Sequence, residues 1–145
     1  MREIKFRAKV KYNGNHYFAG EWVIGHYHQN ENGEHLIFDN EENYIENIGD
    51  FTRYEDVEID ETTLGQYTGL KDKNGKEIYE GDRLSMTDEA GENGVVTVGF
   101  ERGGFIIFAG LPWRYIGTYD ELKNNIEVIG NIHDSVIFMI RRTSK

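Results

Sequence analysis

Three of the chain's four Asn-Gly dipeptides separate short apolar segments, and this spacing limits the chain to mainly antiparallel β structure. The copies are Asn13-Gly14, Asn32-Gly33 and Asn74-Gly75. Asn and Gly tolerate the positive φ angles of tight turns, so each copy predicts a reversal of the chain. Another reversal is expected at Arg102-Gly103-Gly104. At 145 residues, the chain has room for one domain or two small subdomains made of short strands.

The first strand has the clearest pattern. Apolar and charged residues alternate from position 4 to position 12, and this period of two predicts one buried and one basic face. Further strands are expected at residues 21–28 and 35–38 on either side of Asn32-Gly33.

Residues 39–62 are acidic and weakly patterned. We expect a loop there, with one short strand near 44–48. The change in composition predicts a division into an N-terminal β subdomain with an acidic loop (1–62) and a C-terminal β subdomain (63–145), with a shared core left open as an alternative.

Turns lie closer together in the second half. Strands are expected there at residues 66–70, 76–79, 83–86, 94–101, 105–109 and 126–132. By analogy, short strands at this spacing resemble a small SH3-like barrel. One short helix is expected near 119–125, because Thr118 and Glu121 have the spacing of a capping box.

The net charge of −10 is unevenly distributed. Residues 31–61 contain twelve acidic side chains and only Arg53 as a base. The first eleven residues are basic, and four of their cations, on one strand, form a candidate interaction surface: Lys5, Arg7, Lys9 and Lys11. This surface is complementary to the acidic segment, within one chain or between subunits. The acidic excess disfavours broad nucleic-acid binding without excluding it.

Several kinds of chemistry lack their sequence signatures. The chain has no cysteine, which excludes disulfides, thiol catalysis and Cys-ligated metals. It has no P-loop, dinucleotide fingerprint or Gly-x-Ser-x-Gly motif, so we expect neither an enzyme, nor catalytic residues, nor a cofactor. No apolar run approaches the ~20 residues of a membrane helix, and no export signal is recognisable. We therefore expect a cytoplasmic protein without membrane association.

His26 and His28 lie two residues apart in an expected strand, so their side chains share a face. Such a pair could contribute to a zinc site. Because no known zinc spacing is present, we interpret both as ordinary exposed polar residues and predict no metal site.

Two further groups have competing interpretations. Asn74, Gly75, Gly81 and Asp82 are interpreted as a structural motif, with Asp82 accepting backbone hydrogen bonds at a turn. Trp113 and Tyr115, near Tyr119, are candidates for an interaction surface, although aromatic residues in a barrel more often belong to the core.

Three segments together resemble the YopX protein family of phages and prophages. They are residues 1–8, 65–82 and 126–132. The resemblance implies a predominantly β protein that tends to assemble with itself, from a family of unassigned activity with no catalytic residues to transfer.

Together these patterns favour a non-enzymatic phage or prophage accessory protein that forms homo-oligomers and binds a host or phage protein in the bacterial cytoplasm. The alternative is a nucleic-acid-binding module that uses the basic N-terminal strand and a barrel face.

Overall fold

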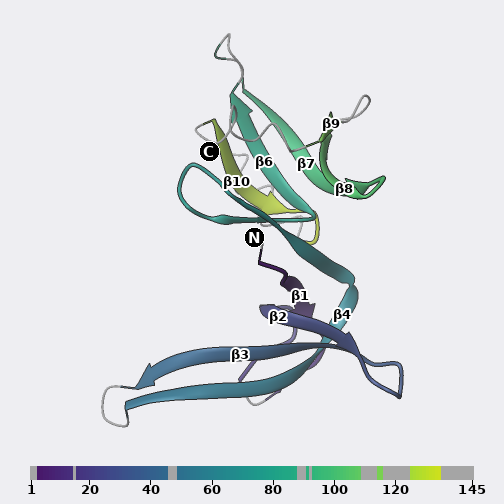
Figure 1. Cartoon of the computed structure of the whole chain (residues 1–145), viewed down its shortest axis with the longest axis vertical. Helices are drawn as coiled ribbons and strands as arrows, with labels where there is room; N and C mark the ends of the chain where they lie inside the picture. The colour runs from purple at the N-terminus through teal and green to yellow at the C-terminus, as the bar shows by residue number, and fades with distance from the viewer. Residues whose placement is uncertain are drawn as a thin grey trace. The chain divides into compact units, whose positions relative to one another are not determined.

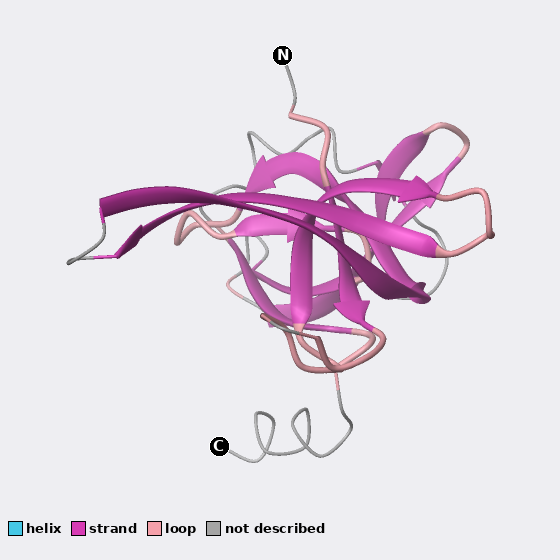
Figure 2. Cartoon of the chain, turned by 90° about the horizontal axis from the view of Figure 1, so that it is seen from below, coloured by secondary structure: helices cyan, strands magenta, loops and turns pink. Residues whose placement is uncertain are grey.

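The computed structural model describes residues 3–14, 16–45, 49–87, 91, 93–108, 114–115 and 125–134. For residues 40–45, 49–55 and 114–115 the description covers the backbone alone. The described residues contain β-strands, turns and loops but no helix (Figure 2). The chain divides into two compact units, Met1–Gln66 and Tyr67–Lys145. The helix expected near 119–125 lies outside the described residues except for Asn125, which is in a turn.

In the first unit, four antiparallel strands form a closed ring. They are β1 (Phe6–Val10), β2 (Trp22–Gln29), β3 (His35–Ile45) and β4 (Gly49–Lys71), the last of which continues into the second unit. β1 pairs with both β2 and β4, and β3 pairs with β2 and β4, so each strand has two neighbours. The ring encloses six buried side chains: Ala8, Val10, Val23, Ile37, Val57 and Ile59.

The prediction of a loop over residues 39–62 is wrong. β3 and β4 form one long antiparallel hairpin, with register from Leu36 opposite Glu58 to Ile45 opposite Gly49. Polar residues occupy both odd and even positions of this segment, so the sequence lacks the period of two that marks a half-buried strand. The hairpin is held by hydrogen bonds between backbone groups, and these do not require a regular alternation of apolar and polar side chains.

The outer part of this hairpin, residues 39–45 with 49–55, is called the acidic ribbon below. β2 pairs with β3 at residues 35–38, and β1 pairs with β4 from residue 59 onward. Within the described residues, the acidic ribbon is therefore a two-stranded element. It extends beyond the other strands of its unit (Figures 1 and 2).

At Gly25 in β2, the backbone of β3 leaves no room for a side chain. A Cβ atom at this position would lie 2.0 Å from the main-chain oxygen of Phe38. We expect Gly25→Ala to lower the free energy of unfolding by about 2–3 kcal/mol, because the overlap is with backbone and no side-chain rotation relieves it. Urea denaturation measures this. Gly94→Ala is the control, because nothing lies within 4 Å of a Cβ there. If Gly25→Ala and Gly94→Ala lowered the free energy of unfolding equally, the close contact between Gly25 and the Phe38 backbone would be contradicted.

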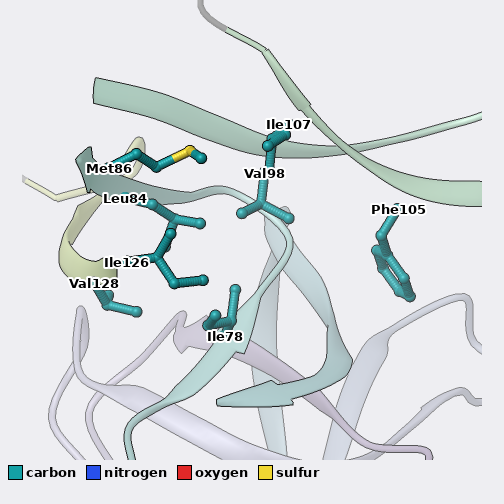
Figure 3. Close-up of a cluster of buried hydrophobic side chains, with 8 residues drawn as sticks. All are labelled: Ile78, Leu84, Met86, Val98, Phe105, Ile107, Ile126 and Val128. Atoms are coloured by element: carbon teal, nitrogen blue, oxygen red, sulfur yellow. The ribbon is translucent and has the colours of Figure 1, made fainter. Parts of the chain in front are cut away.

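The second unit is an antiparallel sheet of five strands in the order β10-β6-β7-β8-β9. Their bounds are β6 Asp82–Thr87, β7 Asn93–Glu101, β8 Gly104–Phe108, β9 Arg114–Tyr115 and β10 Ile126–Asn131. A further short strand, β5 (Glu77–Tyr79), pairs with the end of β4. Eight buried side chains form the core, shown in Figure 3: Ile78, Leu84, Met86, Val98, Phe105, Ile107, Ile126 and Val128.

Two expectations for the second unit have different outcomes. The reversal expected at residues 102–104 is present: Arg102 and Gly103 have φ angles of 50° and 81°, and Glu101 pairs with Gly104. The SH3-like barrel is not confirmed, because the hydrogen-bonded order of the described strands has two distinct ends, β10 and β9.

Candidate functional site

Three side chains of the first unit form a cluster that we call the Trp22 patch: Arg7, Lys9 and Trp22. Register places Lys9 opposite Trp22 and Arg7 opposite Ile24. The Arg7 Cζ atom lies 4.4 Å from the centroid of the Trp22 ring, and the Lys9 Nζ atom lies 5.3 Å from it. Both distances allow cation–π attraction. The patch therefore presents two cations beside one indole.

The other two predicted basic residues bind acids of the same chain. The Lys5 Nζ atom lies 2.9 Å from a Glu3 carboxylate oxygen, and the Lys11 Nζ atom lies 3.6 Å from one of Glu58. The pKa of Lys11 is raised, mainly by its interaction with Tyr12 and further by the Glu58 carboxylate. The Lys11–Glu58 pair and the pairing of Lys9 with Asp60 show that the basic strand meets the acidic segment within a single chain.

The histidines form separate contacts. The His28 Nε2 atom lies 2.7 Å from a carboxylate oxygen of Asp56, and the His35 Nδ1 atom lies 2.6 Å from the Tyr27 hydroxyl. His26 is exposed, as is His28. Among the described residues, no three His, Asp or Glu side chains are grouped as metal ligands.

A pocket of about 370 Å³ lies in the first unit between β2, β3, the residues that precede β1 and the loop residue Tyr17. Its lining residues are Glu3, Ile4, Lys5, Tyr17, Ile24, Gly25, His26, Phe38 and Asp39. Asp39 is only 3% exposed, and the Tyr17 hydroxyl donates a hydrogen bond to its Oδ2 atom. Sequence reasoning missed this pair, because it assigned Asp39 to a loop and Tyr17 to no element.

In the second unit, Asp72 joins a turn to a distant strand. Its Oδ1 atom accepts hydrogen bonds from the backbone N–H groups of Asn74 and Lys76, and its Oδ2 atom accepts one from Val128. Gly75 completes the turn with a φ angle of 81°. Sequence reasoning singled out the turn but not the contact with β10.

Gly81 and Asp82 form a second junction. Gly81 has a φ angle of 92°. The Asp82 Oδ2 atom accepts a hydrogen bond from the Tyr79 N–H group, and its Oδ1 atom accepts one from the Asn131 side-chain amide. The Gly81 oxygen accepts a hydrogen bond from the Ile132 N–H group. These contacts hold the start of β6 against the end of β10.

The aromatic candidates cannot be assembled into a surface from the described side chains. Trp113 and Tyr119 lie outside the described residues, and Tyr115 is placed by its backbone alone, opposite Ile106. Phe105 is buried and makes an edge contact with the Phe100 ring, at 5.2 Å between centroids.

The fold and these contacts define an antiparallel β protein in which a closed ring of strands carries a long ribbon and is followed by a five-stranded sheet. The chain belongs to the YopX protein family, whose sequence model matches residues 5–137. The resemblance to this family is thereby confirmed: residues 65–82 and 126–132 lie within the match, as do residues 5–8 of the first segment.

The fold is also similar to that of a solved structure, protein EF1440 from Enterococcus faecalis. The TM-score is 0.53 and the identity 22%, over 92% of this chain and 95% of that one. No curated protein matches the chain. A helix able to cross a membrane is not found in the described part of the chain.

Proposed function

We propose that this YopX family member is a non-enzymatic phage or prophage accessory protein of the bacterial cytoplasm. It assembles with itself and acts by binding a host or phage protein. The acidic ribbon carries the proposal. An isolated two-stranded element is marginally stable in water, and its unpaired edges favour pairing with another chain.

Charge supports assembly between copies. Besides the buried Asp39, the acidic ribbon contains four acidic residues, Glu41, Glu42, Asp50 and Glu55, against the single base Arg53. The Trp22 patch carries two cations on the same unit. Opposite charges on different surfaces of one chain favour contact between the ribbon of one copy and the patch of another.

Two buried carboxylates of the second unit support a role other than catalysis. Asp72 and Asp82 accept hydrogen bonds from backbone N–H groups and, in the case of Asp82, from a side-chain amide. Groups bound in this way stabilise the fold and are poorly placed to exchange protons with a substrate.

Assembly should depend on salt and on the Trp22 patch. We expect light scattering after size exclusion to give a mass above the monomer in 50 mM salt and a lower mass in 500 mM salt, because screening weakens exposed charge pairs. Reversing both cations of the patch, Arg7→Glu with Lys9→Glu, should weaken assembly by about tenfold or more.

The matched control reverses two exposed cations of the second unit, Lys73→Glu with Lys76→Glu, and changes the net charge equally. A monomer mass for the unmodified chain at every salt concentration would refute assembly. Equal effects of the two double variants would refute a role for the patch.

A second candidate function is nucleic-acid binding. It is favoured by the Trp22 patch, because cations beside an aromatic ring are suited to phosphates and stacked bases. The net charge of −10 opposes it. A mobility shift with single-stranded DNA that weakens steeply with salt and disappears in the Arg7→Glu, Lys9→Glu variant would favour this candidate over protein binding.

A further inference from the structure

We propose that the second unit binds a small organic oxyanion, a carboxylate or a phosphate carried on an apolar group, through the guanidinium group of Arg83. The site lies on the face of the five-stranded sheet away from its core, called the outer face below. Phe108 contacts the apolar group of the ligand. This inference concerns the second unit alone and does not rest on the assembly or the protein binding proposed above.

Strand register places Arg83 on the outer face. Leu84 and Val98 belong to the core of the second unit (Figure 3). Side chains alternate along a strand, so Arg83 and Thr97, which precede them in the sequence, lie on the opposite face. Arg83 is opposite Thr97, and Thr97 is opposite Phe108. A cation, a hydroxyl group and an aromatic ring therefore follow one another across β6, β7 and β8.

The Arg83 guanidinium group is a cation without an anion of its own chain. The side chain is half-buried, and its Nε atom is buried with no hydrogen-bond partner. Arg83 also takes part in none of the ion pairs that the described residues form. A partly desolvated cation is unfavourable unless acceptors and an opposite charge face it. An oxyanion from solution would supply both.

The end of the guanidinium group is the part that a ligand can reach. Nε is buried while the side chain as a whole is partly exposed, which leaves the two Nη atoms. Parallel N–H groups of arginine match the two oxygens of a carboxylate or a phosphate. Thr97, and Ser85 two residues after Arg83 in β6, add hydroxyl donors on the same face. The outer face therefore offers several donors to one oxyanion.

Exposed apolar side chains lie beside these donors. Val95, opposite Ser85, is 47% exposed, and Phe108, opposite Thr97, is 37% exposed. Further along β8 the outer face is covered, since Ile106 is only 3% exposed. An apolar group of the ligand would cover part of Phe108, and burial of such surface gains about 25 cal/mol per Å². An oxyanion with an apolar group should therefore bind more tightly than a bare one.

Two carboxylates near the outer face limit the affinity for anions. Glu127 of β10 lies on this face and pairs with Lys73 at 3.7 Å. The Asp134 Oδ2 atom lies 3.6 Å from the position of a Cβ atom at Gly130, the residue opposite Arg83. Neither carboxylate forms an ion pair with Arg83. Because like charges repel the ligand, removal of the Asp134 charge should strengthen binding.

The test is a titration of the full-length chain in low salt, followed by the backbone amide resonances of Ser85 and Thr97. One arm uses phenylacetate and the other phenyl phosphate. We expect saturable shifts at both amides, and the arm with tighter binding identifies the oxyanion. Phenylacetamide, the neutral isostere of phenylacetate, should bind about tenfold more weakly or worse. Acetate, which lacks the ring, should bind about threefold more weakly than phenylacetate.

Arg83→Gln should weaken binding of both probes by about tenfold or more, because it removes the charge and keeps a polar side chain. Arg102→Gln is the matched control, since Arg102 is an exposed cation in the turn between β7 and β8. Phe108→Ala should remove the advantage of phenylacetate over acetate.

Asp134→Asn should strengthen binding about threefold, and this gain tests the site even if Arg83→Gln fails to fold. Equal binding of phenylacetamide and phenylacetate would overturn the proposal. So would equal effects of the two arginine variants, unchanged binding by Asp134→Asn, or shifts confined to residues outside the outer face.

Discussion

Asp72→Ala should lower the free energy of unfolding by about 4 kcal/mol. Asp72 is 6% exposed and accepts three hydrogen bonds of 2.9 Å, from the backbone N–H groups of Asn74, Lys76 and Val128. Alanine leaves these donors without their acceptor. The Val128 donor is buried, and an unsatisfied buried donor costs about 1–3 kcal/mol, while the two donors of the turn are partly buried and add smaller losses. Urea denaturation followed by tryptophan fluorescence measures the loss, and faster hydrogen exchange at Val128 localises it.

Two variants serve as controls for this prediction. Asp72→Asn keeps one acceptor oxygen, so we expect about half of the loss. Glu127→Ala removes an exposed acid that pairs with Lys73 at 3.7 Å, and exposed pairs contribute little, so its loss should stay below about 1 kcal/mol. A loss for Asp72→Ala as small as that for Glu127→Ala would show that the hydrogen bonds to Asp72 do not stabilise the second unit.

The strands of the second unit were largely predictable, because their signals are local. Arg102 and Gly103 supply the two positive φ angles of the turn between β7 and β8. The apolar alternation of β6 matches its burial pattern, in which Leu84 and Met86 are buried and Ser85 is not. A turn and a period of two can be recognised within ten residues of sequence.

The acidic ribbon was not predictable, because its signal is not local. Its strands hold together through backbone hydrogen bonds between residues up to 16 positions apart, such as Asp39 and Glu55. The acidic composition of the ribbon favours a solvent-exposed loop. Acidic residues on both faces are compatible with a strand only when a partner strand is present.

The closure of the first-unit strands into a ring was also not predicted from the sequence. The sequence suggested a barrel in the C-terminal half by analogy, whereas the ring that the pairings close is that of β1 to β4. Closure depends on β1 meeting β4 across more than 50 residues, as in the pairing of Phe6 with Gln66. Strand lengths and turns do not specify such a contact.

The candidate sites depend on register in the same way. Lys9 was recognised from the basic alternation, but its position opposite Trp22 follows only from the pairing of β1 with β2. The Tyr17–Asp39 contact joins a loop to a strand that the sequence did not indicate. Single residues could therefore be proposed from the sequence, while the groups that they form could not.

Contacts within the second unit explain why two of the segments that carry the family resemblance occur together. Residues 65–82 and 126–132 lie far apart in the sequence, yet Asp72 binds the backbone of Val128, and Asp82 binds the side chain of Asn131. Buried hydrogen bonds thus join the two segments at two junctions. The presence of both segments is explained by their role in folding, and it does not by itself imply a catalytic site.

Asp82→Ala is the second variant with a large expected effect, a loss of about 3 kcal/mol. Asp82 is 1% exposed, and its oxygens accept hydrogen bonds from the Tyr79 N–H group at 2.8 Å and the Asn131 amide at 3.0 Å. Alanine leaves both donors buried without this acceptor. The loss is measured by urea denaturation as for Asp72.

A double-mutant cycle with Asn131→Ala separates the side-chain bond from the backbone bond. Removing both partners eliminates the unsatisfied Asn131 amide, so the double variant should lose about 1 kcal/mol less than the sum of the single variants. The contact with the Tyr79 N–H group is lost in Asp82→Ala whether or not Asn131 is present. If the losses of the two single variants added up to the loss of the double variant within about 0.3 kcal/mol, Asp82 would stabilise the junction of β6 and β10 through Tyr79 alone.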